Sequence, residues 1–165
     1  MTPASFQPFE VWPEPDARMT TMIAGVDEHG RYQPMNYAVM QELTKTWPLT
    51  AATPTGAAER LRVARDMFAL AYYCYEMLPV AGAWALIGVE EALRLRLQST
   101  APLAKLIKLA TDQGLIPEGS EESLHAGRGI RNRLVHGEPP PVWSLGMAEP
   151  VMRVCHTIVA ELSPD

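Results

Sequence analysis

The chain has 165 residues, of which 47% are hydrophobic and 20% charged, and its formal net charge is −5. This length suits one ordinary domain with a substantial core, and the composition is that of a soluble globular protein rather than a disordered or fibrous one. The negative net charge argues against a surface that is basic throughout and grips nucleic acid, although it is compatible with a local basic pocket.

Two cysteines, Cys74 and Cys155, lack the spacing of a metal site, so we expect free thiols in a reducing compartment. The first residues show no basic flank before an apolar run, and we expect no signal peptide. Residues 67–89 are apolar enough to raise the question of a membrane span. Glu76 and Pro79 interrupt that stretch, which favours two packed helices. We therefore expect a cytoplasmic protein with no membrane partner.

Residues 1–55 hold seven of the fifteen prolines and predict an accessory segment packed on a helical body. Inside this segment, the sequence Asp-Glu-His-Gly at 27–30 predicts a turn between short extended pieces near 22–26 and 31–32. A helix is expected over 36–47, because four large apolar side chains recur there at helical spacing: Tyr37, Met40, Leu43 and Trp47.

Residues 56–165 predict an all-α fold, an antiparallel bundle of four to five helices. Apolar residues at spacings of three and four mark a first helix to about Met77, which Pro79 ends. A second helix over 80–97 follows within a few residues, so the two are expected to form a hairpin. Pro150 is compatible with the last helix only in its first turn. The remaining elements are a helix from Pro102 to a stop at Gly114, a helix from an N-cap at Ser120 to Gly137, and a final helix over 147–162.

The helix that ends at Gly137 carries residues suited to chemistry rather than packing. Asn132 and His136 lie one turn apart on the same side, and His125 and Arg128 continue that stripe towards the helix start. Such a stripe presents an amide, imidazoles and a guanidinium to one surface.

Arg131 lies about 140° from His136 on the same helix, within an apolar arc. An unpaired charge there costs several kcal/mol, so a carboxylate partner is expected. Glu90 sits on the inward stripe of the second helix and is the predicted partner, with Glu91 as the alternative. A purely structural pair predicts a loss of about 3–5 kcal/mol for Arg131→Ala.

The pattern Arg131-Asn132-x-x-x-His136 resembles the signature of the HEPN superfamily, and is similar to that of its Abi-like and toxin domains. Residues Val89–Leu93 look like the A-L-E-x-x-L segment that is common in related HEPN sequences. The resemblance covers about residues 56–162, and only the R-N-x-x-x-H core is specific. It implies a small all-helical domain that forms a homodimer in which two motifs face each other.

For active members the resemblance implies a metal-independent endoribonuclease, a toxin or defence protein with a cognate antitoxin or other partner. RNA supplies its own nucleophile, the 2′-OH, so the protein needs a proton-transfer group and a cation for the charged phosphate. His136 suits the first role and Arg131, or Arg128, the second, while Asn132 holds the imidazole or the phosphate. No metal or cofactor is expected, and the products should end in 2′,3′-cyclic phosphates. The expected catalytic residues are thus Arg131, Asn132 and His136, with support from Glu90, Arg128 and His125.

Each residue also has a structural interpretation. Arg131 and Glu90 can simply hold two helices together, and His136 can be a C-terminal helix cap. The alternative function is a non-catalytic binding or dimerisation module for a nucleotide or a partner protein. Glu138 stands where some HEPN toxins have a tyrosine, and its charge opposes tight RNA binding.

Overall fold

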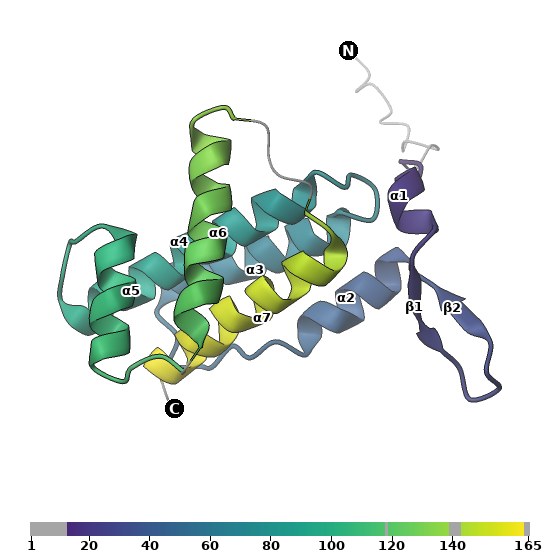
Figure 1. Cartoon of the computed structure of the whole chain (residues 1–165). Coiled ribbons are helices and arrows are strands. Elements are labelled where there is room, and N and C mark those ends of the chain that lie inside the picture. Colours follow the sequence, from purple (N-terminus) through teal and green to yellow (C-terminus); the bar gives the residue numbers. More distant parts are fainter. Residues whose placement is uncertain (1–12, 118, 139–142, 164–165) are drawn as a thin grey trace, which may run out of the picture.

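The structure is a computed structural model that describes residues 13–117, 119–138 and 143–163. Seven helices and one two-stranded sheet are present among these residues, so the expected all-α bundle is confirmed. Figure 1 shows the helices packed into one body, from which a β-hairpin projects at one end. The extended connection expected at Pro139–Pro141 lies outside the described residues.

A short helix and a β-hairpin precede the bundle. They are α1 (Ala17–Thr20), β1 (Ile23–Val26) and the antiparallel β2 (Tyr32–Pro34). The turn and the two extended pieces expected here are confirmed. Asp27 fixes the turn, because its carboxylate accepts the backbone N–H groups of His29 and Arg31, each at 2.9 Å. The hydrogen bond from the Arg31 backbone is the main cause that lowers the pKa of Asp27.

Helix α2 (Tyr37–Lys45) confirms the helix expected in this segment, and Asn36 caps its start with a side-chain hydrogen bond. Met40 and Trp47 are almost fully buried, as is Met19 of α1. All three side chains belong to the same core cluster as the bundle. The segment before the bundle therefore contributes large apolar side chains to the common core.

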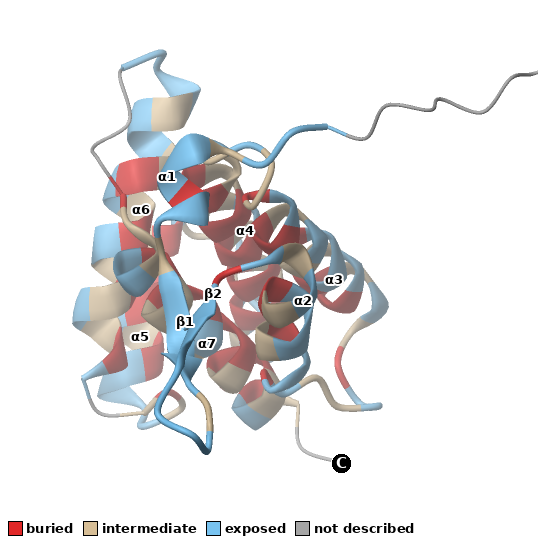
Figure 2. Ribbon diagram, turned by 90° about the vertical axis from the view of Figure 1, so that its right-hand side faces the viewer, coloured by how far each residue is buried: buried red, intermediate tan, exposed pale blue. Residues whose placement is uncertain are grey.

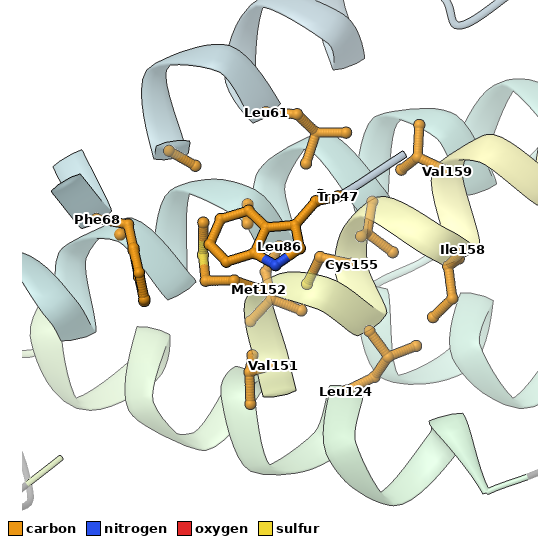
Figure 3. Packing of buried hydrophobic residues seen from close by; sticks show 14 of the residues in the cluster. Trp47, Leu61, Phe68, Leu86, Leu124, Val151, Met152, Cys155, Ile158 and Val159 are labelled. Atoms are coloured by element: carbon orange, nitrogen blue, oxygen red, sulfur yellow. The ribbon is translucent and has the colours of Figure 1, made fainter. Parts of the chain in front are cut away.

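Five helices form the bundle: α3 (Thr55–Leu70), α4 (Met77–Leu97), α5 (Leu103–Asp112), α6 (Ser120–Val135) and α7 (Leu145–Leu162). Helix α4 lies at the centre and packs against the other four. A helix enclosed in this way is apolar on nearly every side, and α4 has buried residues throughout Leu78–Leu93. Figure 3 shows the core, in which Trp47 joins buried side chains of α3, α4, α6 and α7.

The first bundle helix ends earlier than predicted, at Leu70 rather than Met77. The residues that follow form turns on which α1 docks. The Asp16 N–H donates to the Tyr72 carbonyl at 2.9 Å, and the Asp16 carboxylate accepts the Tyr75 N–H at 3.2 Å. Backbone groups that would have continued the helix are used for this contact instead.

Pro79 does not end α3, contrary to the prediction. It is the third residue of α4, where its missing N–H has no intrahelical partner to lose. The apolar stretch over 67–89 is thus divided between two helices. No helix of the described ranges is long and apolar enough to cross a membrane.

Two local expectations for the later helices are wrong. Gly119, with φ of +80°, is the N-cap of α6, and Ser120 is instead its buried first residue. Pro150 is the sixth residue of α7, beyond its first turn. The carbonyl that loses its hydrogen bond to Pro150 belongs to Gly146, which is exposed, so water can bind it.

A fully buried histidine joins α7 to α3. The Nδ1 atom of His156 lies 2.8 Å from the Met152 carbonyl, and its Nε2 accepts the Nε–H of Arg65 at 3.1 Å. These partners assign the proton to Nδ1 and make the imidazole neutral. Burial, opposed in part by the Met152 hydrogen bond, lowers the pKa of His156 to about 4.

This pKa predicts a loss of stability in mild acid. The unfolded chain takes up a proton at His156 near the ordinary pKa of 6.5, whereas the folded chain does so only near 4. The stabilisation is complete above pH 6.5 and is lost as the pH falls from there to 4. We expect the free energy of unfolding in urea to drop by about 2 kcal/mol between about pH 7 and pH 5. The drop should be much smaller in His156→Gln and should persist in His29→Gln, which changes an exposed position. An equal drop in the wild type and in both variants would contradict the assignment of the low pKa to His156.

Candidate functional site

Helix α6 packs on α4 and α7 through a stripe of small and apolar residues. Its buried positions are Ser120, Leu124, Gly127 and Ile130. Gly127 permits the close approach, because a β-carbon there would lie 2.7 Å from Leu86 Cδ1 and 3.4 Å from Val151 Cγ1. This contact fixes the helix just before the residues of the predicted motif.

The last turn of α6 extends beyond the bundle (Figure 1), and Figure 2 shows it largely in the colours of exposed and partly buried residues. Asn132 and His136 are exposed, and Val135 is 71% exposed. Leu134 is partly buried against the core. The end of α6 thus presents polar groups and one large apolar side chain to solvent.

The backbone around His136 is nevertheless well fixed. His136 is the C-cap of α6, and Gly137 follows with φ of +70°, as expected for a left-handed C-terminal residue. The Gly137 N–H donates to the Leu134 carbonyl at 3.4 Å and the Glu138 N–H to the Arg133 carbonyl at 2.9 Å, which is a Schellman motif. The Glu138 carboxylate also lies 3.9 Å from Arg133 Nε, so its charge is partly offset beside His136.

The ion pair expected between Arg131 and Glu90 is present. Arg131 Nη1 lies 3.2 Å from Glu90 Oε2. The Glu90 side chain is 11% exposed and that of Arg131 30%, so the pair lies at the edge of the body rather than inside it. The same carboxylate accepts a hydrogen bond of 2.6 Å from Arg94, one turn further along α4. Glu90 therefore orients two guanidinium groups at once.

The ion pair opens onto a hollow of about 410 Å³ between α3, α4 and α6. Glu91 and Arg60 also line it, and Arg60 Nη1 lies 2.5 Å from Glu91 Oε2. Three arginines thus surround two carboxylates, which leaves one positive charge in excess. The spacing of Glu90 and Arg94 by four residues was a readable helical signal. Arg60 gave no such signal, because it comes from another helix.

The three motif residues do not converge on one another. The guanidinium of Arg131 turns towards Glu90 on α4, whereas Asn132 and His136 are exposed at the end of α6. Among the described residues neither the Asn132 amide nor the His136 imidazole has a side-chain hydrogen bond, and none joins the three side chains. One chain thus provides a guanidinium that is oriented by an ion pair, at Arg131, and an accessible imidazole, at His136, on adjoining turns.

The two supporting residues further back on α6 contact each other. Arg128 Nε lies 3.3 Å from His125 Nδ1, and His125 Nε2 lies 3.5 Å from the Glu121 carboxylate. His125 also lines a hollow of about 700 Å³ beside the start of α6, together with Glu121 and Glu122. These acids make the surface at His125 unsuited to a phosphate.

Both cysteines are free, as expected, and burial raises the pKa of the Cys155 thiol to about 12. Within the described ranges no group of three or more His, Cys, Asp or Glu side chains could hold a metal ion. No protein-family model, no curated protein and no solved structure matches the chain. Functional inference therefore depends on the motif and its geometry.

The coupling between Arg131 and Glu90 should be modest. Arg131 is partly exposed and Glu90 keeps Arg94 when Arg131 is removed, so the cost of a broken buried pair does not apply. In a double-mutant cycle with Arg131→Ala and Glu90→Gln, we expect a coupling free energy of about 1 kcal/mol from urea unfolding. A coupling above about 3 kcal/mol would instead indicate a buried, purely structural pair.

Proposed function

We propose that this protein is a HEPN-type, metal-independent endoribonuclease that acts in the cytoplasm as a homodimer, as a toxin or a defence protein. The observation that carries the proposal is the accessible His136 imidazole. A Schellman motif fixes its backbone at the projecting end of α6, one turn from Asn132. Arg131, held in place by Glu90, lies on the same two turns.

The proposed chemistry follows from these groups. A neutral His136 imidazole takes the proton of a ribose 2′-OH, and the oxygen attacks the adjacent phosphorus. Arg131 or Arg128 stabilises the charge that develops on the phosphate oxygens, with Asn132 as a hydrogen-bond donor. The bond to the 5′-oxygen breaks, and this oxygen takes a proton from the protonated His136 of the second copy. The products are a 2′,3′-cyclic phosphate and a 5′-OH.

The homodimer is supported by the exposed apolar surface beside the imidazole. Val135 is 71% exposed on the turn that carries Asn132 and His136. Covering Val135 with the same turn of a second copy would remove apolar surface from water and bring two imidazoles to one substrate. A single α6 offers one histidine at this turn for two proton transfers.

The test is to incubate the purified protein with structured RNAs in EDTA and to analyse the ends of the products. Cleavage that leaves 2′,3′-cyclic phosphate ends, by a protein that sediments as a dimer, is the expected result. Cleavage that EDTA abolishes would contradict the metal-independent mechanism.

The alternative function is a non-catalytic binding module for a nucleotide or a partner protein such as an antitoxin, and one observation favours it. The Arg131 guanidinium is engaged with Glu90 rather than free. A well-folded dimer that cleaves no RNA would support this function. In that case Arg131→Ala should weaken binding of the nucleotide or partner.

A further inference from the structure

A second basic hollow, of about 320 Å³, lies between α2 and α3 and shares no lining residue with the one at Arg131. Lys45 of α2 lines it, with Arg62 and Arg65 of α3. Asp66 is the one carboxylate among its lining residues. An accessible hollow with three cations is a candidate site for an anion.

Arg65 is the most constrained of these cations. Its half-buried side chain donates from Nε to His156 Nε2 at 3.1 Å and from Nη2 to the Trp47 carbonyl. Both acceptors are neutral, and among the described residues no carboxylate forms an ion pair with Arg65. Burial, followed by the positive charge of Arg62, lowers the pKa of Arg65, and Asp66 opposes this only in part. A guanidinium that is fixed and desolvated but not neutralised is stabilised by an external anion.

The remaining charges leave the hollow positive. Arg62 is exposed and forms no ion pair or side-chain hydrogen bond within the described part of the chain. Lys45 pairs with Glu42 at 2.5 Å, on the exposed side of α2. Counting Glu42 and Asp66 against Lys45, Arg62 and Arg65 leaves one positive charge, carried mainly by the two arginines.

We propose that the hollow between α2 and α3 binds the phosphate group of a small phosphate monoester. Arg62 offers a planar fork that matches phosphate oxygens, and Arg65, whose Nε and Nη2 already donate to His156 and Trp47, adds its remaining N–H groups. A phosphate monoester carries about 1.5 to 2 negative charges at neutral pH, which suits a site with several cations. Asp66 would repel a bare anion but can accept a hydrogen bond from a ligand hydroxyl. A volume of about 320 Å³ lies near the lower end of ligand pockets, which suits a small molecule rather than a nucleic-acid chain.

The test is a titration of the full chain with inorganic phosphate, followed by amide and arginine NMR signals. We expect saturable shifts at Arg62 and Arg65, and affinity about tenfold lower for Arg62→Gln, because one charge-assisted hydrogen bond is lost. The matched control is Arg96→Gln, which removes an equal charge from an exposed arginine of α4 outside the hollow. Its affinity should equal that of the wild type.

Two further arms identify the source of the phosphate. Glycerol 3-phosphate should bind at least as tightly as inorganic phosphate. A 5′-phosphorylated oligonucleotide should bind no more tightly than glycerol 3-phosphate. His136→Ala should bind phosphate normally, so this site and the proposed ribonuclease site can fail separately. Absence of saturation up to about 10 mM phosphate, or equal loss in Arg62→Gln and Arg96→Gln, would overturn the proposal. Tighter binding of the oligonucleotide would overturn its assignment to a small molecule.

Discussion

The His136→Ala variant is expected to lose RNA cleavage by roughly 10³-fold, within the range that general acid–base catalysis contributes. Its melting temperature should equal that of the wild type. The side chain is exposed and has no hydrogen bond among the described residues, and the Schellman motif uses only the backbone around it. The measurements are initial cleavage rates in EDTA and thermal unfolding followed by circular dichroism.

His29→Ala provides the matched control for this variant. His29 is exposed at the tip of the β-hairpin, where its Nε2 lies 3.5 Å from the Glu28 carboxylate. Its removal should change neither cleavage nor stability. Full activity of His136→Ala, or equal losses in both variants, would place the chemistry outside the end of α6 and remove the main support for the ribonuclease.

The features that could be predicted from the sequence are those determined within one helix. The end of α6 before Gly137 could be predicted from the sequence, because glycine readily adopts the left-handed conformation found there. The Arg131–Glu90 pair was readable for a related reason, since a charge on an apolar face requires a partner on the facing helix. Helical spacing indicates which face a residue occupies but not how deeply it is buried. The partial exposure of Arg131 was therefore not predictable.

The features that could not be predicted depend on contacts between distant segments. The early end of α3 follows from the docking of Asp16 on the turn after Leu70, and nothing near Leu70 indicates this contact. His156 lies at a buried helical position, four residues after Met152, but its partner Arg65 is 91 residues away in the chain. Such pairs become visible only when the packing of α2, α3 and α7 is known.

Trp47→Ala is expected to lower the free energy of unfolding by about 4 kcal/mol, because it leaves a large cavity in the core. The indole is 2% exposed and its ring lies 5.0 Å from that of Phe68 and 5.1 Å from that of His156, between centroids. Its Nε1 is buried without a hydrogen-bond partner among the described residues, so Trp47→Phe forfeits volume only and should cost about 1–2 kcal/mol.

Trp84→Ala is the matched control for this experiment, since Trp84 is 38% exposed on α4 and should contribute much less. Urea unfolding of the three variants measures whether the segment before the bundle shares its cooperative core. A single transition that shifts strongly in Trp47→Ala and weakly in Trp84→Ala is expected. A shift below about 1 kcal/mol in Trp47→Ala would mean that the segment can detach while α3–α7 stay folded.

Detachment would also open the hollow at Arg65, because Lys45 and the Trp47 carbonyl both belong to this segment. In that case phosphate should stabilise the wild type but not Trp47→Ala, in which the segment is released.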